Sequence, residues 1–295
     1  MPRGAPYAPG IIAAMRRVVV AAVVFLASVA AAVYGWRVAH PPARTEIRSP
    51  ILKAQHREGQ LRQVLLKELQ PITLSNCDLR RFGEANDGGY LLCGNLLGDV
   101  QSGYSYGISG YDGWGCDISR KLKVKVHQYD CFDLTEPACE GGDTVFHGEC
   151  VAGAPSTDNN SRVFETPEHQ FAKNGDAGKH LVVKMDVEGA EWETFVAMPD
   201  QVLDQIDQLA VEFHGSGEER FGDAIRKLKR FFYIANLHFN NYSCADHFAP
   251  FPSWAYEVLL VNKRLGKPDA SAAPAAPSSL NTPNNPKVPD CQATR

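Results

Sequence analysis

The feature that most constrains the fold is an alternation of strand-like and helix-like segments between residues 102 and 262. Runs rich in β-branched, aromatic and aliphatic residues predict strands at 102–108, 124–129, 144–147, 181–185, 208–213, 232–239 and 255–262. Segments with helical spacing lie between most of them, at 114–122, 165–171, 190–196 and 218–230. Strands joined through helices form a parallel sheet with helices on both faces. The last two strands have no helix between them, so one of them is expected to run antiparallel near an edge. The sequence therefore predicts a doubly wound α/β fold.

Residues 18–36 form an apolar segment without a charged side chain, directly after two arginines. Nineteen helical residues, at about 1.5 Å each, nearly span a hydrocarbon layer of about 30 Å. Tyr34 and Trp36 close the segment, and such aromatic rings favour the membrane interface. The segment is therefore expected to be a single-pass signal-anchor. The small residues at 27–30 leave a cleaved signal peptide, and with it a secreted protein, as the alternative.

The cysteines and two sequons indicate an oxidising compartment. The chain has eight cysteines, and none forms a Cys-x-x-Cys pair, which favours disulfides over a structural zinc site. Asn159 and Asn241 begin Asn-x-Ser sequons, which carry glycans only in the secretory pathway. The domain is therefore expected to face the lumen of the endoplasmic reticulum or Golgi. A net charge of −4 without a basic block argues against nucleic acid as a partner.

Composition divides the chain into five parts. They are a short N-terminal segment (1–17), the expected anchor (18–36), a linker followed by a helix (37–76), the α/β domain (77–265) and a C-terminal segment (266–295). The last part is rich in Pro, Ala, Ser and Asn and has almost no large apolar residue. Such a segment buries too little surface to offset its ordering entropy, so a disordered tail is expected there.

A glycine-rich turn follows the first predicted strand, in the stretch YGISGYDGW (106–114). Gly107 and Gly110 allow the backbone to approach a ligand closely, and the helix that follows offers free N–H groups. Asp130 ends the second predicted strand, 23 residues after Gly107, where an acid can accept hydrogen bonds from ribose hydroxyls. Together they predict a nucleotide-like ligand at the carboxyl ends of the strands, with an ordinary turn and a turn aspartate as the structural alternatives.

The stretch HLVVKMDVEGAEWETF (180–195) places Asp186, Glu188 and Glu191 directly after a buried strand. Its Lys-x-Asp-x-Glu-Gly-x-Glu pattern resembles the signature of FkbM-like S-adenosylmethionine-dependent methyltransferases. Further similar segments are RFG at 81–83, NDGGY at 86–90, YSYGISG at 104–110, LAVEFHG at 209–215, LHFNNYSC at 237–244 and AYEVLLVNKR at 255–264. The last two resemble the methyltransferase-like branch with membrane-anchored members. The resemblance spans about residues 77–264.

The resemblance implies a class I, Rossmann-like methyltransferase fold, with a mostly parallel seven-stranded sheet, one antiparallel strand near the edge and helices on both faces. It implies that S-adenosylmethionine lies over the glycine-rich turn with its ribose on Asp130. Tyr106 stands where most class I enzymes carry an acid, so Asp112 or Asp87 is expected to contact the amino group of the cofactor's methionine. The expected cofactor-binding residues are Gly107, Gly110, Asp130, Asp87, Gly88, Gly89 and Asp112.

The acceptor is expected to bind at the strand ends beside Asp186. Methylation of a hydroxyl needs a base, and His214 is the preferred one, with Asp186 and Glu212 as catalytic partners. Alternatively, Asp186, Glu188 and Glu212 hold a divalent metal ion that lowers the pKa of the acceptor hydroxyl. Glu191 is expected to be a first-turn helix acid.

The sequence thus predicts an S-adenosylmethionine-dependent methyltransferase that acts on a small acceptor, expected to be a hydroxyl of a sugar or glycan. Two other functions stay open. The missing acid before Gly107 allows a non-catalytic lumenal binding protein on a degenerate methyltransferase fold. The acidic turn at Asp186 allows a glycosyltransferase, although its Asp-x-Glu differs from the usual Asp-x-Asp.

Overall fold

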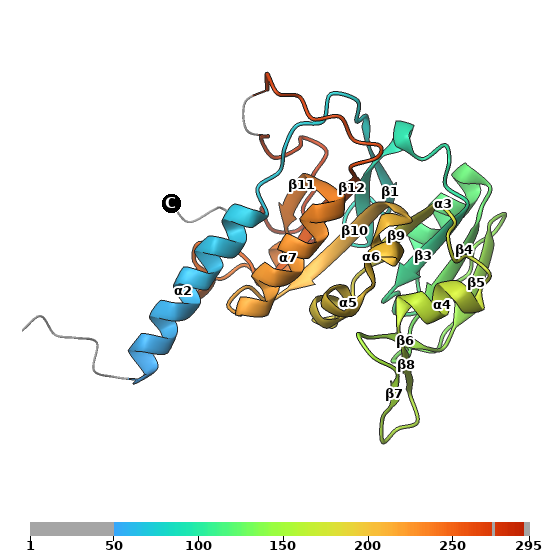
Figure 1. Ribbon diagram of the computed structural model, residues 1–295, viewed down its shortest axis with the longest axis horizontal. Helices are drawn as coiled ribbons and strands as arrows, with labels where there is room; N and C mark the ends of the chain where they lie inside the picture. The colour runs from blue at the N-terminus through green and yellow to red at the C-terminus, as the bar shows by residue number, and fades with distance from the viewer. Residues whose placement is uncertain (1–49, 273–274, 292–295) are drawn as a thin grey trace, which may run out of the picture. The chain divides into compact units, whose positions relative to one another are not determined.

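The computed structural model describes residues 50–272 and 275–291 (Figure 1). The expected N-terminal segment 1–17 and the expected anchor 18–36 lie outside these ranges. Within them, no helix combines the length and the apolar character needed to cross a membrane. The chain divides into two units at residue 55, and every site and contact below belongs to the second unit, 56–295.

The central sheet has seven strands in the order β11-β12-β10-β9-β3-β4-β5 (Figure 1). Their bounds are β3 (Ser102–Tyr106), β4 (Lys125–Tyr129), β5 (Asp143–His147), β9 (Leu181–Met185), β10 (Ile206–His214), β11 (Phe232–Phe239) and β12 (Ala255–Asn262). Strand β12 runs antiparallel to both of its neighbours, β10 and β11, whereas the pairs from β10 to β5 are all parallel. The predicted sheet with one reversed strand is confirmed. The fold is that of a class I methyltransferase.

Helices cover both faces of this sheet. Their bounds are α2 (Pro50–Glu68), α3 (Gly113–Leu122), α4 (Pro167–Lys173), α5 (Glu191–Ala197), α6 (Asp200–Asp204) and α7 (Glu219–Phe231), with 3-10 turns η1 (Gly94–Leu96), η2 (Asn241–Ser243) and η3 (Asp246–Phe248). Side chains alternate between the faces of a strand. Val183 of β9 therefore packs into a core with α5 and α7, whereas Val182 packs into a second core with α3. The two cores fix the strand ends on which the site is built.

Local sequence sets where two of the helices begin. Asp112 caps α3 by accepting a hydrogen bond from the backbone N–H of Gly115 at 2.8 Å. Thr166 caps α4, and Pro167 follows at the first helical position, where its missing N–H costs nothing. The glycine-rich turn after β3 leads directly into a helix, as the sequence predicts, but the cap by Asp112 was not predicted.

Two small sheets lie outside the predicted elements. β1 (Leu79–Gly83) and β2 (Gly89–Cys93) form an antiparallel hairpin, and β6 (Cys150–Val151), β7 (Ser156–Thr157) and β8 (Val163–Glu165) form a three-stranded sheet. Most of their segments lack the run of aliphatic, β-branched and aromatic residues that identifies the central strands, as LRRFG in β1 shows.

The predicted disulfides are confirmed. The structure pairs Cys77 with Cys93, Cys116 with Cys139, Cys131 with Cys150 and Cys244 with Cys291. All eight cysteines of the sequence are therefore paired. Four disulfides indicate an oxidising environment, such as the secretory pathway or the extracellular space.

The prediction of a disordered tail over 266–295 is wrong for residues 275–291. Cys291 is joined to Cys244 by a disulfide. Asn284 is 2% exposed, and its Nδ2 donates hydrogen bonds to Glu257 Oε1 at 2.7 Å and to Asp87 Oδ1 at 3.2 Å. The disulfide and the polar contacts hold the tail in place. The low apolar content of the tail, on which the prediction rested, shows neither of them.

The two sequons differ in accessibility because of this tail. Asn159 is exposed, whereas Asn241 is 5% exposed. The Nδ2 atom of Asn241 donates hydrogen bonds to the carbonyl oxygens of Asn285, Val288 and Pro289. A glycan would displace these contacts, so Asn159 is the sequon available in the folded domain.

Candidate active site

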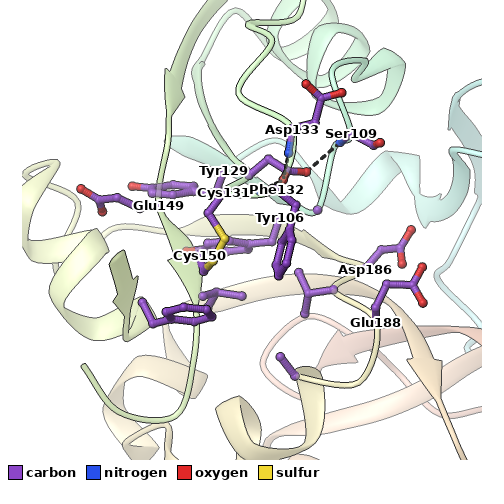
Figure 2. A pocket seen from close by; sticks show the side chains of 16 residues that line it. Tyr106, Ser109, Tyr129, Cys131, Phe132, Asp133, Glu149, Cys150, Asp186 and Glu188 are labelled. Atoms are coloured by element: carbon purple, nitrogen blue, oxygen red, sulfur yellow. Dashed lines mark hydrogen bonds between the residues drawn. A yellow bond between two sulfur atoms is a disulfide. The ribbon is translucent and has the colours of Figure 1, made fainter. Parts of the chain in front are cut away.

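A cavity of about 580 Å³, which we call the large cavity, lies at the carboxyl ends of β3, β4 and β9 (Figure 2). Small-molecule sites commonly enclose about 300–1,000 Å³, and in α/β sheets they lie at this edge. In Figure 2, Asp186 and Glu188 lie on one side of the cavity and the Cys131–Cys150 disulfide on the other. The full lining is Tyr106, Gly107, Ser109, Tyr129, Asp130, Cys131, Phe132, Asp133, Glu149, Cys150, Val151, Phe164, Asp186, Val187, Glu188 and Ala190.

Gly107 begins the turn that borders the cavity, with a φ of 71°. A Cβ atom at this position would lie 1.6 Å from the carbonyl oxygen of Asp186. Only glycine allows the ends of β3 and β9 to approach so closely. Lys184 of β9 fixes the same turn, because its Nζ donates a hydrogen bond to the carbonyl oxygen of Gly107 at 2.6 Å. Gly107 therefore brings the glycine-rich turn and the acidic turn together.

Asp130 lines the cavity as predicted, but its carboxylate is bound to the backbone. Oδ2 accepts hydrogen bonds from the N–H groups of Ile108 at 3.1 Å and Ser109 at 2.8 Å. Oδ1 accepts from Phe132 at 2.8 Å and Asp133 at 3.0 Å. A carboxylate has about four acceptor positions, so these four bonds satisfy it. Asp130 holds two loops in place, and its carboxylate has no position left for a ribose.

Asp133 supplies a second carboxylate to the cavity beside Asp130. It lines the cavity, and its Oδ2 faces the Cα of Gly110, because a Cβ there would lie only 2.9 Å away. Hydrogen bonds from Thr135 lower the pKa of Asp133, so its side chain is an anion at neutral pH. Sequence reasoning missed Asp133 because it lies in a loop after the strand end.

The remaining predicted cofactor residues lie outside the cavity lining. Asp112 is buried, where it caps α3 and accepts a hydrogen bond from Gln128 at 2.8 Å. Asp87 precedes Gly88 and Gly89 at the turn of the β1–β2 hairpin and accepts a hydrogen bond from the tail. Neither Asp112 nor Asp87 lines the cavity, so their predicted contact with the cofactor stays a prediction.

A second group of side chains adjoins the cavity at the carboxyl ends of β9 and β10. We call it the His214 cluster, and its members are Asp186, Glu188, Glu191, Glu212 and His214. The Nε2 atom of His214 lies 3.8 Å from Asp186 Oδ1, 3.6 Å from Glu188 Oε2 and 3.8 Å from Glu212 Oε1. Its Nδ1 atom lies 3.0 Å from Glu191 Oε1. The structure thus brings together the predicted catalytic residues and both predicted metal-ligating glutamates.

The acidic turn reaches this arrangement through an unusual backbone. Glu188 has a φ of 55°, in the left-handed region that side chains rarely adopt, and the next residue is Gly189. The turn directs the carboxylates of Asp186 and Glu188 to the same side (Figure 2). Glu191 follows in the first turn of α5, as predicted, but it is fully buried and contacts His214. Its position in the cluster was not predicted, because helical spacing does not show which strand end a first-turn acid faces.

The charges around His214 oppose the role of general base that the sequence suggests. Burial favours the neutral ring, but the hydrogen bond and charge of Glu191 and the charges of Asp186 and Glu212 outweigh it. They raise the pKa of His214 to about 9. In this structure the ring therefore carries its proton at neutral pH and cannot accept another. Burial and the negative charges of Asp186 and Glu257 raise the pKa of Glu212.

Neighbouring side chains hold the cluster in place. Tyr90 donates a hydrogen bond to Asp186 Oδ2 at 3.1 Å, and Asn240 donates to Glu212 Oε1 at 2.7 Å. The indole N–H of Trp192 donates to the carbonyl oxygen of His214 at 2.7 Å. Asp186 belongs both to the His214 cluster and to the lining of the large cavity. Its carboxylate faces His214.

A second, more open cavity of about 380 Å³ adjoins His214. Trp254 lines it, is 38% exposed, and has its ring centroid 5.1 Å from that of His214. Arg62 and Arg220 line its rim. A partly exposed indole offers a flat apolar surface next to polar groups. The His214 cluster therefore lies between two cavities.

Comparisons with known proteins leave the family open. No family model matches the sequence, and no curated protein matches it. Among solved structures, it is similar to the Methanococcus jannaschii fibrillarin, a pre-rRNA processing protein, at 12% identity. The match covers 57% of this chain and 69% of that chain, with a TM-score of 0.36. A similarity this low supports no conclusion about function, and the fold follows from the strand order alone.

Proposed function

We propose that the chain is an S-adenosylmethionine-dependent methyltransferase that methylates a hydroxyl group of a sugar or glycan. The observation that carries this proposal is the cavity at the carboxyl ends of β3, β4 and β9, in a sheet with class I methyltransferase topology. The resemblance of the acidic turn to FkbM-like enzymes supports it.

The residues of the large cavity fit this cofactor. S-adenosylmethionine has a cationic sulfonium centre, and the lining includes the carboxylates of Asp133, Glu149, Asp186 and Glu188. We assign the ribose to Asp133 and the adenine to the ring of Phe132, which is 74% exposed. When bound, the cofactor supplies an activated methyl group. Ser109 and Gly107 border the cavity with backbone groups that can approach a ligand closely.

Asp186 has the position to orient the acceptor. Tyr90 holds its Oδ2 atom, while Oδ1 faces the cluster. We assign to Asp186 a hydrogen bond from the acceptor hydroxyl, which directs the oxygen toward the large cavity. The exposed face of Trp254 suits the apolar face of a sugar ring. A hydroxyl acceptor fits this cluster because carboxylates can accept its proton.

The four disulfides support a secretory or extracellular location for this reaction. We retain the anchor at 18–36, with the domain facing the lumen, as part of the proposal. A small-molecule or glycan acceptor remains the proposed partner, and nucleic acid is not one.

A non-catalytic binding protein is the second candidate, and two observations favour it. Tyr106 is fully buried where class I enzymes usually carry an acid, and the carboxylate of Asp130 is satisfied by the backbone. Such a protein would use the same cavities for binding without transferring a methyl group.

Transfer of radiolabelled methyl groups to a panel of oligosaccharides tests the proposal. Asp186→Asn should lower turnover by about 10²–10⁴ while S-adenosylhomocysteine affinity stays within about twofold. Glu193→Gln is the matched control, because Glu193 lies on α5 but pairs with Arg220 at the surface. Full activity of Asp186→Asn would dismiss its role. Cofactor binding without transfer to any acceptor would favour the non-catalytic candidate.

A further inference from the structure

We propose that the His214 cluster is a binding site for a divalent metal ion that has both nitrogen and oxygen ligands. Its ligands are the Nε2 atom of His214 and the carboxylates of Asp186, Glu188 and Glu212, which face that nitrogen. The existence of the site is independent of the proposed function, whereas its role in methyl transfer rests on it.

The spacing around His214 Nε2 fits a shared ion better than direct hydrogen bonds. Its carboxylate neighbours lie 3.6–3.8 Å away, beyond the usual 2.7–3.2 Å of a hydrogen bond. Divalent ions such as zinc bond histidine nitrogen and carboxylate oxygen at about 2.0–2.2 Å. Two ligands of one ion are therefore about 3–4.4 Å apart, depending on the angle between them. The distances of 3.6–3.8 Å from Nε2 to the three carboxylate oxygens lie within this range.

The ring is already oriented as metal-bound histidines are. A histidine that binds a metal through one ring nitrogen usually donates the N–H of its other nitrogen to a carboxylate. This hydrogen bond fixes the tautomer and directs the first nitrogen to the ion. In this structure Nδ1 of His214 lies 3.0 Å from Glu191 Oε1. Nε2 is the nitrogen that faces Asp186, Glu188 and Glu212.

The Nε2 atom of His214 supplies an independent indication of a missing cation. The side chain of His214 is 3% exposed. Three carboxylates face Nε2, but among the described residues none lies within hydrogen-bond distance of it. A buried polar atom without a hydrogen-bond partner is costly. A metal ion bonded to Nε2 would satisfy it.

The charge of the cluster also calls for a cation. Its four carboxylates outnumber the two cationic groups beside them, the protonated ring of His214 and the ammonium group of Lys184, which lies 3.7 Å from Asp186. An ion would replace the proton on Nε2. Lys184 directs its hydrogen bonds to the carbonyl oxygens of Tyr106 and Gly107. Imidazole combined with carboxylates suits a first-row transition ion such as Mn²⁺ better than Mg²⁺, which prefers oxygen ligands alone. An ion here would lie beside Asp186, where we place the acceptor hydroxyl.

Calorimetric titration of the chelator-treated full chain with Mn²⁺ tests the site without any acceptor. We expect one ion per chain, with a dissociation constant in the micromolar range, and a higher melting temperature with Mn²⁺ present. Asp186→Asn and Glu188→Gln should each weaken binding by about tenfold or more. Glu188 has a side chain that is 79% exposed, so its substitution leaves the fold intact. Glu193→Gln should bind Mn²⁺ as the wild type does.

The absence of Mn²⁺ binding by the folded protein would overturn the inference, as would equal binding by all three variants and the wild type. A parallel titration with S-adenosylhomocysteine separates the two proposals. Mn²⁺ binding without S-adenosylhomocysteine binding would leave the metal site standing and contradict the methyltransferase. S-adenosylhomocysteine binding without Mn²⁺ binding would contradict the metal site alone.

Discussion

The carboxylate of Asp130 accepts a hydrogen bond from the backbone N–H of Ser109 at 2.8 Å, which ties the end of β4 to the glycine-rich turn after β3. The same carboxylate holds the loop that carries Phe132 and Asp133. Both loops border the large cavity. The shape of the proposed cofactor site therefore depends on one side chain that does not itself need to touch the cofactor.

Replacing Asp130 by alanine should lower both stability and cofactor affinity. Four backbone N–H groups lose a charged acceptor, which we expect to lower the free energy of unfolding by about 2–3 kcal/mol. Urea denaturation measures this loss, and titration with S-adenosylhomocysteine should show a parallel decrease in affinity. The matched variant Asp133→Ala should lower affinity about 30-fold or more and leave stability within about 0.5 kcal/mol. Lower affinity with unchanged stability in Asp130→Ala would instead restore Asp130 as a direct ribose ligand.

Removing the Cys244–Cys291 disulfide should release the C-terminal tail. The bond closes a loop of 47 residues, and its loss should lower the free energy of unfolding by about 2–4 kcal/mol. In the double variant Cys244→Ala, Cys291→Ala, trypsin should cut after Lys287 faster than in the wild type. The tail also covers Asn241, so its release should expose that sequon. Cleavage at the wild-type rate would mean that the polar contacts of Asn284 and its neighbours suffice to hold the tail.

Acid should destabilise the domain through His127. Burial lowers the pKa of His127 to about 4, although the nearby charge of Asp176 opposes this. Between about pH 4 and 6.5 the unfolded chain binds a proton that the folded one does not, so stability decreases as the pH falls through this window. From pH 7 to pH 5 this residue should account for a loss of about 2 kcal/mol. Urea denaturation at both values should show a smaller loss for His127→Gln. An equal loss in that variant would assign the acid sensitivity to other groups, such as His147, whose pKa is also lowered by burial.

The sequence predicts the fold well because periodic patterns report local burial. Leu181 to Met185 read as a buried strand, and the structure places all five residues in the middle of the sheet. The reversed strand followed from the missing helix before Ala255. The β1–β2 hairpin was not predicted, because its first strand, LRRFG, contains two arginines and a glycine and does not resemble a strand.

The site was predicted only in part, because sequence shows which residues end the strands but not where their side chains find partners. Asp186, Glu212 and His214 do meet, as the parallel strand ends require. Asp112 was assigned to the cofactor from its place after the glycines, but a capping aspartate has the same sequence position. Glu191 was assigned to the helix dipole alone, although its carboxylate also contacts His214.

The central claim is that the large cavity binds S-adenosylmethionine, and calorimetric titration of the folded chain with S-adenosylhomocysteine tests it most directly. The account predicts one molecule bound per chain, with a dissociation constant in the micromolar range, weakened about 30-fold or more by Asp133→Ala and unchanged by Glu193→Gln. A folded protein that releases no heat and gains no thermal stability at millimolar S-adenosylhomocysteine would contradict the account.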